Sequence, residues 1–157
     1  MPTVRLRAAE SRLLYLAVQY HLDRPGAELD PATGRPATHG LGELAPRLLG
    51  AGEGDLLLTL TPLQARRLDS AILGAINELK VYPMLAAREG EASARRSMAS
   101  RFEAALLELW PAVANDPEEA LALVPPLVAL RRRLAGAAAE AGPSEGERRP
   151  WWRFWAR

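Results

Sequence analysis

Apolar residues recur three and four positions apart along most of the chain, which is the spacing of an amphipathic helix. The clearest stripe consists of Leu68, Ile72, Ala75 and Leu79. Helices are expected over residues 9–22, 62–79, 92–110, 117–124 and 126–141, and 41–49 could add one short helical turn or two. The pattern therefore predicts a mainly α-helical protein, a compact bundle of four to five helices, in one domain that covers residues 1–141.

Two short apolar runs have the character of β-strands, Val4–Arg7 near the start of the chain and Leu56–Leu60 farther along. Each run leads directly into an expected helix, and the apolar positions that follow correspond between the two halves. We expect the two runs to pair as a small two-stranded β ribbon. An isolated ribbon of this size is not stable in water, so it would need two helices packed on it.

Prolines, glycines and capping residues predict where the helices start and stop. Thr61-Pro62 predicts a helix start, with threonine at the N-cap and proline in the first turn, and Asp116-Pro117 predicts another. Val81-Tyr82-Pro83 is expected to interrupt or bend the chain, and Pro125-Pro126 to disturb a helix. Gly74 lies in mid-helix, where glycine costs about 1 kcal/mol relative to alanine, so we expect another helix to approach it closely.

Residues 23–40 contain three prolines and three glycines without apolar periodicity, which predicts a long surface loop. Loops of this length are usually functional or mobile. His39 lies in this loop with carboxylates upstream at scattered spacing, which is a weak metal signal, and we interpret it as a solvated residue. His21 lies near the end of the first helix, where a structural role is expected and the helix C-terminus favours the charged imidazolium.

Composition excludes several classes of function. The formal net charge is +1, so no overall field attracts nucleic acid, and there is no cysteine for disulfides, thiolate catalysis or cysteine-bound zinc. Nineteen of the 20 basic residues are arginine, a bias typical of a bacterial protein encoded by a GC-rich genome. No cofactor or metal is expected.

Motifs for catalysis are absent from the sequence: there is no phosphate-binding loop, dinucleotide fingerprint, HExxH or G-x-S-x-G elbow. We therefore expect a protein that is not an enzyme, without catalytic, cofactor-binding or metal residues. The alternative is a small-ligand or enzyme site near Asp69, Asn77 and Glu78 on one helix. Arg131-Arg132-Arg133 is interpreted as a solvated helix surface, because successive helix positions point about 100° apart.

The C-terminal segment 148–157 carries the main functional signal, and a polar, breaker-rich linker, 142–147, precedes it. Three of the four tryptophans lie in it. On a helical wheel Arg149, Arg153 and Arg157 fall on one arc and the aromatic residues on the opposite arc. The candidate partner- or membrane-binding residues are Arg149, Trp151, Trp152, Arg153, Phe154, Trp155 and Arg157. So short a segment is not helical alone in water, so we expect it to order only against a partner.

This segment predicts an interaction or adaptor module of unknown pathway. Tryptophan and arginine suit the interface of an anionic membrane, and tryptophan anchors also suit a groove on a protein partner or on a second copy of the chain. Single-stranded nucleic acid could stack on the rings but is the least favoured partner. The segment could also fold back onto its own domain.

The N-terminus lacks the apolar run of a signal peptide, and no apolar run is long enough to cross a bilayer. The expected location is therefore the cytoplasm, with a peripheral position on the inner membrane face as a second possibility.

Overall fold

The structure is a computed structural model and describes residues 1–24, 28–35, 37–87 and 100–140. Its elements, in chain order, are β1 (Thr3–Leu6), α1 (Ala8–Asp23), α2 (Leu44–Gly50), β2 (Leu56–Thr59), α3 (Pro62–Ala86), α5 (Ser100–Leu109), α6 (Ala112–Asn115), the 3₁₀ helix η1 (Pro117–Leu123) and α7 (Val124–Glu140). The fold is mainly helical and compact, with a two-stranded antiparallel sheet, as the hydrophobic pattern predicts. The first part of the expected helix 92–110, the linker 142–147 and the segment 148–157 lie outside the described residues.

The predicted ribbon is confirmed. β1 and β2 pair antiparallel, from Thr3 opposite Thr59 to Leu6 opposite Leu56. Successive strand residues point to opposite faces, so Val4 and Leu6 enter the core while Leu57 stays largely exposed. The ribbon therefore covers one side of the helical core.

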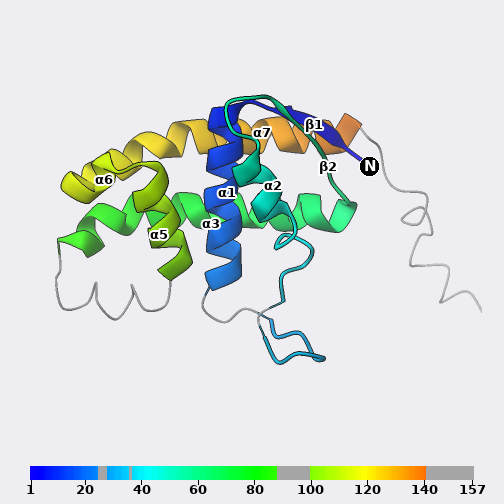
Figure 1. Ribbon diagram of the computed structural model, residues 1–157, viewed down its shortest axis with the longest axis horizontal. Coiled ribbons are helices and arrows are strands. Elements are labelled where there is room, and N and C mark those ends of the chain that lie inside the picture. The colour runs from blue at the N-terminus through cyan, green and yellow to red at the C-terminus, as the bar shows by residue number, and fades with distance from the viewer. Residues whose placement is uncertain (25–27, 36, 88–99, 141–157) are drawn as a thin grey trace, which may run out of the picture.

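Three long helices form the body of the molecule. α3 and α7 run antiparallel to one another and α1 crosses them, while α2 and α5 pack against α1 (Figure 1). The largest fully buried side chains come from nearly every element: Phe102, Leu6, Leu14, Leu16, Leu41, Leu48, Leu58, Leu60, Leu68, Ile72, Leu79 and Leu106. One continuous core holds the helices and the ribbon together.

The start of α3 is capped as the sequence predicts. The Thr61 hydroxyl accepts a hydrogen bond from the backbone N–H of Gln64 (3.1 Å), and the Gln64 side chain accepts one from the Thr61 N–H (2.9 Å). This reciprocal pair satisfies two backbone donors that the first helical turn would leave open. The Gln64 amide also donates to the carbonyl of Gly40 (3.0 Å), so the same residue holds the end of the 23–40 loop.

Gly74 of α3 lies against α1, which confirms the expected close contact with another helix. The Tyr20 ring of α1 lies directly on Gly74, and a Cβ built there would overlap it, with Tyr20 Cζ only 2.6 Å away. The other side of the Tyr20 ring meets Phe102 of α5 edge-on, with centroids 5.9 Å apart. Glycine in α3 thus makes room for a ring that joins α1 to α5.

The expected interruption of the chain at Val81-Tyr82-Pro83 is not found. α3 continues through Pro83 to Ala86, because a proline so near the helix end removes a single backbone donor and leaves the preceding turns intact. Asp116 does cap a helix, by accepting from the Glu118 N–H (3.0 Å), but that helix is the 3₁₀ segment η1. The disturbance expected at Pro125-Pro126 is found: η1 ends at Leu123, and α7 begins at Val124 with both prolines in its first turn, where a missing N–H costs nothing.

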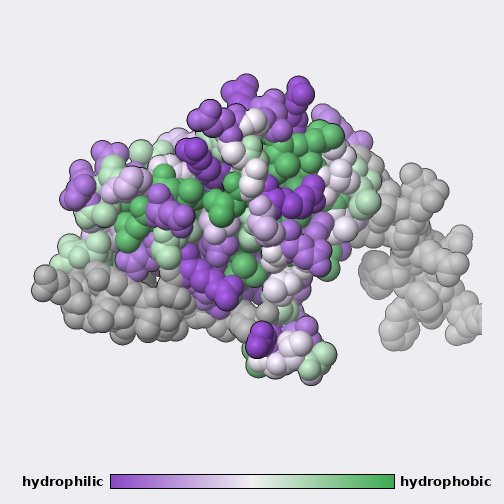
Figure 2. Space-filling view, viewed as in Figure 1, coloured by the Kyte–Doolittle hydropathy of each residue, from purple (hydrophilic) through white to green (hydrophobic). Residues whose placement is uncertain are grey.

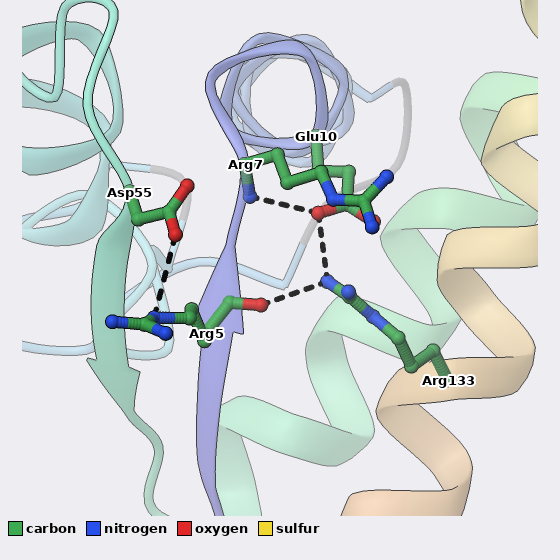
Figure 3. Close-up of polar contacts among 5 residues, drawn as sticks. All are labelled: Arg5, Arg7, Glu10, Asp55 and Arg133. Atoms are coloured by element: carbon green, nitrogen blue, oxygen red, sulfur yellow. Dashed lines mark hydrogen bonds and ion pairs between the residues drawn. The ribbon is translucent and has the colours of Figure 1, made fainter.

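The arginine run 131–133 lies on the surface as expected, with Arg132 and Arg133 exposed, and two of its members also contact other elements. Figure 3 shows Arg133 reaching from α7 to β1 and the start of α1, where it donates to the Arg5 carbonyl (3.0 Å) and pairs with Glu10 (2.9 Å). The same Glu10 oxygen accepts from the Arg7 N–H (2.8 Å). These contacts fasten α7 to the strand-to-helix junction.

The surface mixes polar and apolar residues. Figure 2 shows hydrophobic surface over the ribbon, and Leu57 of β2 is among the exposed large apolar side chains. Of the helices that the structure describes, none combines the length and the apolar character that a membrane-spanning segment needs.

Candidate functional site

An apolar groove of about 770 Å³ opens between α3, α7 and the first residues of the chain. Figure 1 shows the N-terminus, the start of α3 and the end of α7 gathered at the same end of the molecule. The groove is lined by Met1, Pro2, Val4, Leu60, Pro62, Ala65, Arg66, Leu68, Asp69, Ser70, Ile72, Arg131, Leu134, Ala135, Ala138 and Ala139. Most of these side chains are apolar, and no aromatic ring is among them.

The groove exists because α7 ends in small residues. The five residues before Glu140 are all alanine or glycine, and Ala135, Ala138 and Ala139 face the groove. Alanine favours the helix strongly but fills little space, so α7 continues beyond the part of the core that its leucines fill. The result is a helical wall with open apolar surface beside it.

One ion pair borders this groove. Arg131 of α7 donates from Nε and from a terminal nitrogen to the two carboxylate oxygens of Asp69 on α3, at 2.7 and 2.9 Å. The two-pronged hydrogen bond raises the pKa of Arg131 above its ordinary value. This pair fixes the distance between the two groove-forming helices at one point.

Replacing Asp69 by asparagine should therefore have a small effect on stability. Both side chains are more than a third exposed, and exposed ion pairs contribute at most about 1 kcal/mol. We expect Asp69→Asn to lower the free energy of unfolding by about 0.5 kcal/mol, as measured by urea denaturation. The double variant with Arg131→Gln should be less stable than either single variant by at most about 0.5 kcal/mol. Both substitutions remove the same contact, so their effects should not add.

The three polar residues of α3 that the sequence singled out do not lie together. Asp69 borders the groove, whereas Asn77 and Glu78 are not among its lining residues. Asn77 lies about 12 Å farther along the helix and is exposed, and Glu78 is half-buried. Only Asp69 therefore belongs to a described cavity.

A second cluster joins the 23–40 loop to α1. His21 Nε2 lies 3.1 Å from His39 Nδ1, and His39 Nε2 lies 3.3 Å from Glu28 Oε2. Glu28 also lies 3.9 Å from Arg67 of α3. The His39 side chain is only 11 % exposed, so the prediction of a solvated loop histidine is wrong. Its backbone has φ +51°, a left-handed conformation that few residues other than glycine adopt.

The hydrogen bonds determine how the protons are arranged in this cluster. A carboxylate only accepts, so His39 Nε2 carries the proton that it donates to Glu28. In a neutral His39 ring Nδ1 is then the acceptor, and His21 Nε2–H is the donor. His21 Nδ1 is left as a buried acceptor without a hydrogen-bond partner in the described structure. A second proton on His21 would therefore sit in a buried place with no acceptor.

The environment of His21 accordingly opposes its positive charge. The residue is 1 % exposed, and burial lowers its pKa from 6.5 to about 4, with smaller contributions from Arg24, His39 and Arg67. The expectation that the helix C-terminus favours the imidazolium is wrong, since desolvation and the neighbouring cations outweigh the helix dipole. His21 is a neutral structural residue that anchors the loop.

The carboxylates near His39 do not gather around it as ligands. Asp30 instead closes a turn of its own loop, where its side chain accepts from the Ala32 N–H (2.8 Å). Within the described residues, no group of three or more histidine and acidic side chains is placed to hold a metal ion.

All of the predicted partner-binding residues, Arg149, Trp151, Trp152, Arg153, Phe154, Trp155 and Arg157, lie outside the described residues. The groove itself was not predicted from the sequence. The signal that could have revealed it is the change from leucine to alanine along α7, which leaves the end of a long helix without large core residues. No family model, curated protein or solved structure was found to match the chain.

Proposed function

We propose that this protein is a non-enzymatic interaction module that docks on a membrane surface or a protein partner through its Arg/Trp segment 148–157. The observation that carries the proposal is the open apolar groove at the end of α7. Exposed apolar surface of this kind is typical of interaction sites on small proteins. The groove-forming helix leads directly toward a segment that is itself rich in aromatic anchors.

The segment has the composition of a docking element. Tryptophan and arginine are the residues that contribute most to protein interfaces, and both also suit the headgroup region of an anionic membrane. Opposite arcs of arginine and aromatic residues would let the rings enter an apolar environment while the guanidinium groups stay in water or contact phosphates.

Removing residues 150–157 tests this function. We expect the full chain to bind vesicles that contain phosphatidylserine, or to form specific cross-links to a protein in cells, and the shortened chain to do neither. Each arginine near an anionic surface contributes about 1 kcal/mol, so vesicle binding should weaken strongly at high salt. The matched control is a chain with Trp151, Trp152 and Trp155 replaced by alanine and every arginine retained. The proposal fails if the shortened chain binds as the full chain does.

A small-ligand-binding function is the second candidate, and the groove volume favours it. About 770 Å³ lies within the range of small-molecule sites, about 300–1,000 Å³, and the lining is apolar with a few polar groups such as Asp69 and Ser70. A metabolite that raises the melting temperature of the full chain, but not that of Ala138→Gln, would support this candidate over the docking module.

A further inference from the structure

We infer that the groove between α3 and α7 binds the chain's own C-terminal segment, with the aromatic side chains of residues 151–155 packed on the alanines of α7. This inference rests on the proposed docking role of residues 148–157 and adds to it a resting site on the same molecule. The segment would be held in the groove until an external surface competes for its rings.

The groove presents small apolar side chains, and the segment carries large aromatic ones that could pack on them. Ala135, Ala138 and Ala139 present small apolar side chains along one wall, while Leu68 and Ile72 of α3 lie on the other. No aromatic ring is among the described residues that line this cavity. Residues 151–155 contain three tryptophans and one phenylalanine, and an aromatic ring buries about 150–250 Å² of surface.

The chain between the groove and the segment is long enough for the segment to return to the groove. α7 ends at Glu140, directly after the lining residue Ala139, and the first tryptophan is Trp151. Ten intervening residues span up to about 33 Å when extended. The groove wall from Arg131 to Ala139 is only about 12 Å long at the rise of an α-helix. The chain can therefore reverse direction, helped by Gly142-Pro143, and return along the groove.

The charged residues of the groove also favour the rings over the arginines. Among the described residues that line the groove, the one acidic side chain is Asp69, which already pairs with Arg131. Arginines pointing inward would therefore find no unpaired carboxylate among these residues. In a helical segment the aromatic arc faces the groove and the arginine arc faces solvent. Binding inside the molecule should accordingly depend little on salt, in contrast to binding of an anionic membrane.

The test uses cysteines, because the chain has none of its own. Ala156→Cys places a thiol in the segment and keeps every aromatic residue. In the full chain it is combined with Ala138→Cys in the groove, or with Gly136→Cys in the same stretch of α7. Gly136 is exposed, and a Cβ there meets nothing within 4 Å. A disulfide needs Cβ atoms within about 4.5 Å, so it reports close approach.

We expect the disulfide within one molecule to form about tenfold faster with Ala138→Cys than with Gly136→Cys. The linker alone gives both positions a similar effective concentration of the segment thiol, so a difference of this size requires docking. Replacing Trp151, Trp152 and Trp155 by alanine should remove the difference. Equal rates in the two cysteine pairs, or disulfides formed mainly between molecules, would overturn the inference.

Tryptophan fluorescence gives a second, independent measurement. In a Trp110→Phe background all remaining tryptophans lie in the segment. Filling the groove with Ala135→Gln and Ala138→Gln should raise acrylamide quenching about twofold and shift emission to the red, because the rings lose buried contacts. The control Gly136→Gln should change neither value, and a change of equal size there would count against the groove.

The two proposals fail in different ways. If the segment binds vesicles or a protein but shows no preference for Ala138→Cys, the docking function stands and the resting site is wrong. If the disulfide preference is found and no external surface binds the segment, residues 148–157 belong to the fold and the docking function is wrong.

Discussion

The free energy of unfolding is expected to fall by about 3 kcal/mol as the pH is lowered from 6.5 to 4, through His21 alone. The pKa of His21 in the folded protein is about 4, against 6.5 in the unfolded chain. Below pH 6.5 the unfolded chain therefore takes up a proton that the folded protein does not. The contribution of His21 to the free energy of unfolding is present in full well above pH 6.5 and decreases between pH 6.5 and 4. It changes little more well below pH 4. Urea denaturation at a series of pH values measures the slope.

His21→Gln is the matched variant, because glutamine stays neutral and can still donate a hydrogen bond to His39 Nδ1. Its stability should vary much less between pH 6.5 and 5 than that of the wild type. The groups that face His21 are Arg24, His39 and Arg67, and Glu28 lies beyond His39; all four are present in both proteins. Identical slopes in the two proteins would contradict the role given to His21.

Gly74→Ala is expected to lower the free energy of unfolding by about 2 kcal/mol, although alanine is the better helix former by about 1 kcal/mol. The new methyl group would overlap the Tyr20 ring, which cannot retreat without disturbing its edge contact with Phe102. The measurement is the midpoint of urea denaturation, with the slope of the transition unchanged.

The control is Gly136→Ala, which makes the same substitution in α7 with open space around it. It should raise stability by up to about 1 kcal/mol. Combining Gly74→Ala with Tyr20→Leu should recover part of the loss, since the smaller side chain leaves room for the methyl group. If both glycine replacements stabilise the protein equally, close packing at Gly74 is not the reason for the glycine.

The sequence predicted the helical class, the ribbon and the capped start of α3 because each depends on local signals. Apolar spacing identifies helices, and Thr61-Pro62 sets a helix start whatever surrounds it. Gly74 was informative for the opposite reason: a helix-weakening residue in a strong helix indicated a tertiary contact before its partner, Tyr20, was known.

The remaining features depend on residues far apart in the chain. The ion pairs of Arg131 and Arg133 could not be predicted, because their partners, Asp69 and Glu10, lie in α3 and α1. The low pKa of His21 results from burial and from cations that only the folded chain brings together. The groove is a space between elements, and no periodicity in a single helix predicts a space.

The ribbon has a consequence for the order in which this protein can fold. β1 pairs with a strand more than 50 residues away, and the start of α1 is fastened by Arg133 from the other end of the domain. Closing a loop of this length costs conformational entropy before the long-range contacts can form. The first strand and helix therefore gain little stability by themselves. During synthesis β1 and the start of α1 therefore lack their contacts with Arg133 until α7 has left the ribosome.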